Sequence, residues 1–523
     1  MKIKIALTIC LLTIQASSLL AQKQVPANWF NLDAKKNKVP GVSTERAYNE
    51  LLKNKTSKTI IVAVIDGGTD NKHEDLKNNI WTNGKEIEGN GIDDDNNGYI
   101  DDSHGWNFIG GANDDVKEDN LEITRIYANL TLKYANGDDG SDEFKVYLGI
   151  KKDFEVRLLK AKSEITNNQN IIDGIDKIIK PFNNQNPTKE QLKSYQPEGQ
   201  SDEIAKQILL KISGGKMSAT DLKNILNIAM EHYTQQVKYH LNTNLNTRAI
   251  VGDDYNNTAE KIYGNNNYKG PEANHGTHVA GIIAASRNNN IGMNGVSDNV
   301  RIMILRVVPN GDERDKDVAN AIRYAADNGA NIINMSFGKS FSPQKKVVDE
   351  AVKYASIKNV LLVHAAGNDN NSIDIENNFP NKTFDATATQ APNWIEVGAS
   401  SWTKGKHIVG DFSNYGKQNV DVFAPGVDIY STLPDNTYGS YDGTSMAAPV
   451  TAGVAALLWS YYPYLTAVEV KDIILNSAVK VKGKVIVPGE KKKKVKMAEL
   501  CKTGAIVNAF QAIKYAEKFA KNK

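Results

Sequence analysis

Three short segments each carry one residue type used by nucleophilic hydrolases. Asp66 follows six apolar residues in IIVAVIDGG, His275 lies at the start of NHGTHVAGIIAAS, and Ser445 lies in YDGTSMAAPVTAG. Singly, each has an ordinary explanation, because Asp before Gly favours a turn and an isolated Ser at a helix start is usually a cap. Together, in chain order, they supply an orienting carboxylate, an imidazole base and a hydroxyl nucleophile.

The histidine segment also allows a second chemistry. His275 and His278 are three positions apart, a spacing with which both could bind one zinc ion. No third ligand stands out nearby, and no Glu lies between them as in a zinc protease helix. A metal-dependent hydrolase therefore stays open as an alternative, and its activity would not depend on Ser445.

Short continuous apolar runs that alternate with helical patterns are expected to position these residues. The runs span 60–65, 300–308, 331–337, 360–364 and 394–397. Between them, 317–330 and 347–359 have apolar residues three and four positions apart. Unbroken apolar strands are typical of a parallel sheet covered on both faces. The sequence thus predicts an α/β fold, a doubly wound and mostly parallel sheet with helices on both faces, and places Asp66 at a strand's carboxyl end.

From about residue 117 to 250 the pattern becomes helical alone. Apolar residues recur at three and four positions from Tyr147 to Ile165 and from Leu222 to Tyr233, and a capping-box pattern, Ser218 with Asp221, precedes the second run. This pattern predicts a helical insertion. Such an insertion could be a decoration packed on the core, or a lid or arm that recruits substrate.

Composition and the first residues bear on partners and location. The 523 residues contain 63 Lys+Arg and 61 Asp+Glu, so a net charge of +2 offers no electrostatic footprint for nucleic acid. Lys2 and Lys4 precede a short apolar run, as in a cleaved signal peptide. We expect an exported monomer, in the periplasm, the medium or at the cell surface, with no membrane span after cleavage. Only Cys501 would then remain, so no internal disulfide is expected.

In order and local context, these segments resemble the subtilisin family of serine proteases (subtilases, peptidase S8). The resemblance covers about 45–112 and 250–515 and leaves the insertion uncovered. It implies a subtilisin-like fold and a serine endopeptidase in which Ser445 is the nucleophile, His275 the general base and then acid, and Asp66 the group that orients His275. The segment VHAAGNDNN implies that Asn368 donates a hydrogen bond to the developing oxyanion.

The resemblance also implies a polypeptide-binding cleft. Its two walls would be formed by Ser336, Phe337 and Gly338, and by Ala365, Ala366 and Gly367. Small residues let a peptide backbone lie close and pair as an added β-strand, so the expected partners are polypeptide substrates. The rival from another class is a catalytically silent subtilase-like module that binds polypeptides with the insertion closed over the cleft.

With the resemblance, the predicted organisation has six parts. These are a signal peptide (1–21), an N-terminal extension (22–58), the catalytic domain in two parts (59–116 and 251–517), the helical insertion (117–250) and a C-terminal tail (518–523).

Two segments predict structural calcium (Ca²⁺). In NGIDDDNNGYIDD, Asp93, Asp95 and Asn97 alternate as in the first half of an EF-hand loop, and Asp101 is in the ninth position, although His104 replaces the twelfth-position Glu. An acidic surface turn is the alternative. The segment SRNNNIGMNGV resembles the family's calcium loop and implies these ligands: the side chain of Asn289, the carbonyls of Arg287, Ile291 and Met293, and Asp75.

Overall fold

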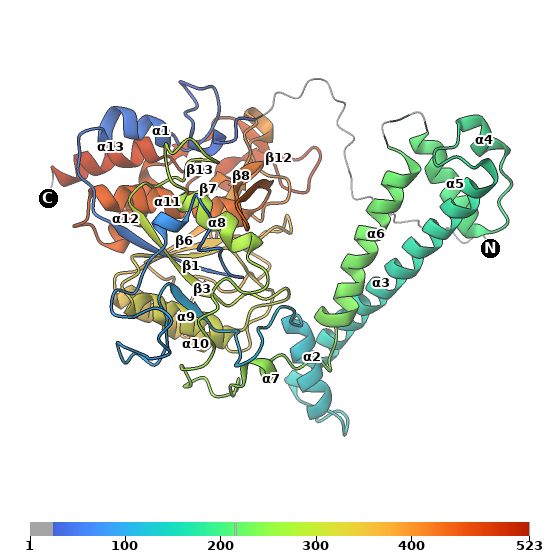
Figure 1. The fold of residues 1–523 in the computed structure, drawn as a ribbon, viewed down its shortest axis with the longest axis horizontal. Coiled ribbons are helices and arrows are strands. Elements are labelled where there is room, and N and C mark those ends of the chain that lie inside the picture. Colours follow the sequence, from blue (N-terminus) through green and yellow to red (C-terminus); the bar gives the residue numbers. More distant parts are fainter. Residues whose placement is uncertain (1–24, 214, 216, 522–523) are drawn as a thin grey trace.

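A nine-stranded sheet forms the centre of the molecule in the computed structural model, which describes residues 25–213, 215 and 217–521 (Figure 1). The strand order is β10-β13-β7-β6-β5-β4-β1-β3-β2, and every pairing is parallel except that of β10 with β13. This sheet confirms the predicted fold class. The predicted signal peptide, 1–21, lies outside the described residues.

The elements have the following bounds. The strands are β1 (Ile60–Asp66), β2 (Gly105–Asn107), β3 (Val300–Arg306), β4 (Ile332–Met335), β5 (Leu361–Ala365), β6 (Trp394–Ser400), β7 (Val422–Pro425), β8 (Ile429–Leu433), β9 (Thr437–Tyr441), β10 (Val479–Lys480), β11 (Lys484–Ile486), β12 (Lys494–Lys496) and β13 (Ala505–Ile506). The α-helices are α1 (Thr44–Ala47), α2 (Glu122–Lys133), α3 (Asp142–Ile179), α4 (Lys189–Ser194), α5 (Gln200–Ile212), α6 (Ala219–Gln235), α7 (Arg248–Val251), α8 (Asn274–Ala284), α9 (Asp315–Asp327), α10 (Lys345–Ile357), α11 (Thr444–Tyr461), α12 (Ala467–Ser477) and α13 (Ala509–Ala520).

The sheet is covered on both faces, which explains its unbroken apolar strands. Along β1, Val62 and Val64 pack in the cluster that includes α8 and α11, whereas Ala63 and Ile65 pack in the cluster that includes α9 and α10. Figure 1 shows α9 and α10 on one side of the sheet and α11, α12 and α13 on the other. Alternate side chains point to opposite faces, so both sets must be apolar.

Helix α11 is apolar on all sides because it lies inside the core. It contacts β1, β4, β5, β6 and β7 as well as α8. A Cβ added at Gly453 would lie 2.6 Å from the Cβ of Val296, which shows how closely neighbouring chain approaches it. A helix that is hydrophobic all round is a buried helix, and small residues permit this close packing.

Helices α2 to α6 form an arm that extends sideways from the sheet (Figure 1). Near its base, Ile150 and Phe154 of α3 pack with Ile123 of α2. A separate cluster farther along joins α3 to α4, α5 and α6. The capping box at Ser218 and Asp221 is present, as predicted. In the described part of the chain, no helix has the length and apolar character needed to cross a membrane.

Candidate active site

Asp66 and His275 form a bonded pair at the carboxyl edge of the sheet. Asp66 is the last residue of β1, and His275 is the second residue of α8. His275 Nδ1 lies 2.8 Å from Asp66 Oδ1 and 2.9 Å from Oδ2. A carboxylate only accepts hydrogen bonds, so Nδ1 donates and Nε2 is left to accept a proton. The His275 side chain is 40% exposed, whereas that of Asp66 is 4% exposed.

The surroundings of His275 raise its pKa above the ordinary value for histidine. Burial lowers the pKa of His275, while the charge of Asp66 and its hydrogen bond raise it, and the net direction is upward. The close approach of α8 to β1 needs glycine, because a Cβ on Gly276 would lie 2.1 Å from the carbonyl oxygen of Gly68.

Ser445 is the second residue of α11, and helices α8 and α11 pack against each other. Its Oγ donates to the carbonyl of Ser336 at 3.0 Å, and the Ser336 hydroxyl donates to the Ser445 carbonyl at 2.9 Å. Within the described residues, the Ser445 hydroxyl makes no hydrogen bond to His275. A hydroxyl rotates freely, and catalytic hydrogen bonds commonly tighten only when substrate is bound.

The side chain of Asn368 is oriented by the residue that precedes Ser445. Its Oδ1 accepts hydrogen bonds from the backbone N–H and the hydroxyl of Thr444, at 2.9 and 3.0 Å. This leaves the Asn368 amide nitrogen to donate elsewhere. Gly367, just before it, has a φ of +99°, and a Cβ there would lie 2.3 Å from Asn414 Nδ2. Thr444 and Asn414 are therefore supporting residues that the sequence analysis missed.

The two predicted substrate walls extend from neighbouring parallel strands. Ser336, Phe337 and Gly338 follow β4, while Ala365 ends β5 and is followed by Ala366 and Gly367. Asn378 reaches both walls: its Nδ2 donates to the Ala365 carbonyl at 3.1 Å, and a Cβ on Gly338 would lie 2.4 Å from its Oδ1. His364 also joins the walls through its Nε2, 2.8 Å from the Phe337 carbonyl.

His278 lies in a different environment from His275. It is fully buried, its Nε2 lies 3.1 Å from the Gly439 carbonyl, and its ring stacks on Tyr441 with centroids 4.5 Å apart. Burial lowers its pKa to about 4. The two histidines therefore make separate contacts: His275 pairs with a carboxylate and His278 packs in the core.

Part of the first predicted calcium loop gathers around a residue that the sequence analysis did not name. Oxygens of Glu86, Asp93 and Asp95 lie within 4.8 Å of one another, and Glu86 Oε2 is buried without a hydrogen-bond partner. Carboxylates in this arrangement fit a hard cation. In the sequence, the one feature that points to Glu86 is that it is an acidic residue shortly upstream of the motif.

The two other predicted ligands of this loop accept hydrogen bonds from the backbone. The Asp101 carboxylate accepts the backbone N–H groups of Gly89, Asn90 and Gly91. The side-chain oxygen of Asn97 accepts the N–H of Tyr99. Both residues thus shape the backbone around the three carboxylates.

The second predicted calcium site also has some of its members together. Asp75 is fully buried, and its carboxylate accepts from Asn289 Nδ2 at 2.7 Å and from the Met293 N–H at 3.4 Å. Burial raises the pKa of Asp75, against the effect of these hydrogen bonds. The Arg287 side chain instead bonds to Gly295 and Glu45, and Asn289 Oδ1 accepts from Ile291. The carbonyl ligands, from Arg287, Ile291 and Met293, stay predictions.

Fold and site together define an α/β protein with a carboxylate–imidazole pair, a serine in the first turn of a buried helix and a side-chain amide along one edge of a parallel sheet. The model of the subtilase family matches residues 57–500, and the chain belongs to that family.

Known relatives match part of the chain. A thermophilic serine proteinase of Bacillus sp. (strain AK1) is 42% identical over 211 residues, which is 40% of this chain and 48% of that protein. Subtilisin amylosacchariticus of Bacillus subtilis subsp. amylosacchariticus is 39% identical over 210 residues, 39% of this chain and 51% of that protein. The chain thus spans about half the length of these relatives. A solved protease structure from Pseudoalteromonas arctica has a TM-score of 0.48 and 20% identity, covering 94% of this chain and 99% of that one.

Proposed function

We propose that the protein is an exported serine endopeptidase that hydrolyses peptide bonds through a Ser445 acyl-enzyme. The observation that carries this proposal is the bond from His275 Nδ1 to both oxygens of Asp66, at the start of a helix packed against the one whose second residue is Ser445. That contact fixes the imidazole tautomer that can act as a base.

The chemistry follows from these contacts. His275 Nε2 takes the proton of Ser445 as Oγ bonds to the scissile carbonyl carbon, and the positive charge that forms on the ring is stabilised by Asp66. The Asn368 amide and the Ser445 N–H stabilise the oxyanion. His275 then returns the proton to the leaving amine as the C–N bond breaks. Water, activated by the same nitrogen, hydrolyses the acyl-enzyme.

The proposal is tested by casein hydrolysis with residues 22–523 in millimolar calcium. Ser445→Ala should be inactive, and wild type should take up a serine-directed fluorophosphonate and lose activity. Ser460→Ala is the matched control, because that buried serine lies in the same helix and, among the described residues, its hydroxyl bonds only to the Leu457 carbonyl. Equal activity of Ser445→Ala and wild type would falsify the acyl-enzyme and favour the metal-dependent alternative, which zinc chelators would inhibit.

The silent binding module gives a different result in this assay: a folded wild type that binds casein but neither cleaves it nor takes up the label. The distal helices of the arm, α4 and α5, extend away from the sheet in Figure 1, which favours an open site.

We also propose that calcium stabilises this fold at two positions. The buried, unpartnered Glu86 Oε2 beside Asp93 and Asp95 supports the first, and the buried Asp75 carboxylate beside Asn289 supports the second. Bound calcium would act on stability and not on the chemistry at Ser445. Export is proposed from Lys2, Lys4 and the apolar run after them, and N-terminal sequencing of the secreted protein tests it by showing whether Gln22 is the first residue.

A further inference from the structure

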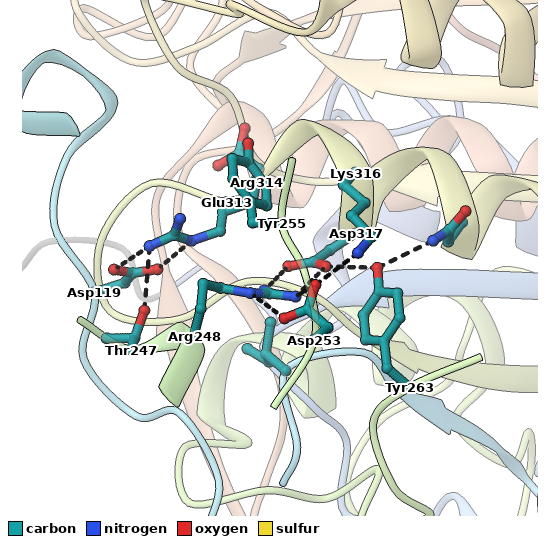
Figure 2. Close-up of polar contacts among 12 residues, drawn as sticks. Asp119, Thr247, Arg248, Asp253, Tyr255, Tyr263, Glu313, Arg314, Lys316 and Asp317 are labelled. Carbon is teal, nitrogen blue, oxygen red and sulfur yellow. Dashed lines mark hydrogen bonds and ion pairs between the residues drawn. The ribbon is translucent and has the colours of Figure 1, made fainter. Parts of the chain in front are cut away.

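A network of buried charges joins the foot of the arm to the catalytic domain. We call it the foot network, and it includes Asp119, Glu122 and Arg125, where the chain enters the arm, and Arg248, Asp253 and Tyr263, after it returns. Their partners lie at the start of α9 and after β4. Figure 2 shows the return side of this network and, from the entering side, Asp119 with its partner Arg314; dashed lines mark the bonds.

On the return side, the contacts fix the chain to α9. Arg248 bonds to Asp317 at 2.7 Å, and Lys316 bonds to Asp253 at 2.7 Å. The Tyr263 hydroxyl donates to Asp317 at 2.7 Å (Figure 2). None of these contacts involves a residue of the two predicted substrate walls.

On the entering side, the network reaches one of those walls. Lys339 is the residue immediately after Gly338, and its side chain is 1% exposed. Its Nζ lies 2.8 Å from Glu122 Oε2 on α2 and 2.8 Å from Asp315 Oδ1 on α9. It also donates to the Glu313 carbonyl at 2.8 Å. Glu122 in turn bonds to Arg125 at 2.6 Å.

Apolar packing two residues after Lys339 also anchors the segment that follows this wall. Phe341 packs against the cluster of Ile123, Ile150 and Phe154 at the base of the arm. The Lys339 backbone also exchanges two hydrogen bonds with Phe379, which further restricts the chain at this point. Residues 339–341 are therefore built onto the arm, although the wall belongs to the sheet domain.

Buried ion pairs of this kind are better suited to fixing geometry than to adding stability. Desolvation offsets most of the attraction between the charges, and apolar residues of similar size often stabilise a fold equally well. The directed contacts of Lys339, to two carboxylates and a carbonyl, instead specify where its backbone lies.

We propose that Glu122 and Lys339 are positioning residues, through which the foot of the arm holds the wall Ser336–Gly338 in the conformation that pairs with an extended polypeptide. This inference rests on the proposed function, which places substrate along that wall. The arm then contributes to binding of polypeptides and leaves the chemistry at Ser445 unchanged. A small ester that acylates Ser445 without pairing with the wall does not need this contact.

The test compares a hexapeptide substrate with p-nitrophenyl acetate in wild type, Glu122→Gln, Lys339→Met and the double variant. We expect each single variant to raise KM for the hexapeptide about 10-fold with kcat nearly unchanged, and to leave ester hydrolysis unchanged. Since the two residues share one interaction, the KM of the double variant should be no higher than that of the more impaired single variant. Glu122→Gln keeps the side-chain shape, so it remains informative if Lys339→Met does not fold.

Lys345→Met is the matched control. Lys345 is also buried and donates to a carboxylate, Asp349, and to a carbonyl, Thr383, both at 2.6 Å, but on α10. It should lower stability without changing KM. An unchanged hexapeptide KM in Glu122→Gln, or equal losses with peptide and ester, overturns the positioning role alone. A wild type that neither cleaves nor takes up fluorophosphonate overturns the proposed function together with this inference.

Discussion

At the scale of single residues, the contrast between His275 and Asp66 matters most. The imidazole is partly open to solvent and the carboxylate is buried, so the charge of Asp66 acts on His275 through a medium of low polarity. This interaction outweighs the effect of burial on the pKa of His275. The pH dependence of hydrolysis therefore reports on the pair.

Replacing Asp66 by Asn should shift the acid limb of kcat/KM to lower pH. Only neutral His275 can accept the proton, so activity falls as the pH drops below its pKa, which Asp66 raises. Without that charge the pKa falls. In addition, kcat should drop about 10⁴-fold, because the amide no longer fixes the tautomer. Initial rates from pH 4 to 9 would measure both effects, and an acid limb that does not move would contradict the assignment.

Glu313→Gln should make the protein less sensitive to alkaline pH. Burial, with help from Asp312 and against Lys339, raises the pKa of Glu313 to about 8, and its Oε1 has no hydrogen-bond partner. The native state thus holds this proton more tightly than the unfolded chain does. The stability of wild type should fall as pH rises from about 4.5 to about 8, and the amide should abolish this component.

Urea unfolding at pH 6 and pH 9 measures this effect. The gain of Glu313→Gln over wild type should be about 1–3 kcal/mol at pH 9 and smaller at pH 6. Glu203→Gln, on the exposed surface of α5, is the control. The same pH dependence in Glu313→Gln and wild type would show that Glu313 is not the titrating group.

The proposed catalytic residues could be predicted from the sequence, but not all of the residues that hold the sites in place. Asp66 and Ser445 stand out because each adjoins a long apolar or small-residue run. In the structure, Asp66 ends β1 and Ser445 bonds to Ser336, just after β4. Thr444 and Glu86 look ordinary in the sequence, since their roles depend on neighbours distant in the chain. Lys339 reads as an exposed lysine, yet it is buried against Glu122 of the arm and Asp315 of α9.

At the scale of elements, the arm has two separate cores. Ile175 and Ile178 of α3 pack with Leu209 of α5 in the distal cluster, which shares no residue with the clusters that flank the sheet. The distal half of the arm should therefore unfold independently of the catalytic domain.

Ile178→Ala tests this independence. Removing this fully buried side chain should destabilise the distal arm by about 2–5 kcal/mol and leave kcat/KM for peptides unchanged. In calorimetry, only the transition of the arm should move to lower temperature. Ile304→Ala, in β3, should instead lower the main transition. A single transition lowered equally by both variants would show that the arm and the domain unfold together.

For β1 and β3, which are buried along nearly their whole length, the predicted boundaries are close to those in the structure. The long apolar runs at β1 and β3 are strands, as predicted. The run 331–337 is shorter as a strand and ends at Met335, because the next residues leave the sheet to form the wall. The strands β2, β10 and β13 have two or three residues each, too few for a periodic pattern.

At the scale of the whole molecule, stability should depend on calcium. The one described cysteine, Cys501, is free and buried, so stability within the described residues comes from packing, buried ion pairs and any bound cation. A ligand that binds only the native state stabilises it by about 2.7 kcal/mol at 100 times its Kd.

Chelation of calcium should lower the Tm, and Glu86→Gln and Asp75→Asn should each remove part of the calcium dependence. Differential scanning calorimetry across a calcium titration measures this. Magnesium is the control, because it favours a smaller octahedral site. A Tm that does not respond to calcium in wild type would contradict both sites while leaving the acyl-enzyme proposal intact.

The position of α11 in the chain also has a consequence for when activity can arise. This helix packs against five strands of the sheet and carries the proposed nucleophile as its second residue, yet it starts only at Thr444. A nascent chain that has not reached this residue lacks both the hydroxyl and the helix against which β4, β5 and β6 pack. Under the proposed function, proteolytic activity therefore cannot build up gradually during translation. It emerges only when the segment that begins at Thr444 folds onto the rest.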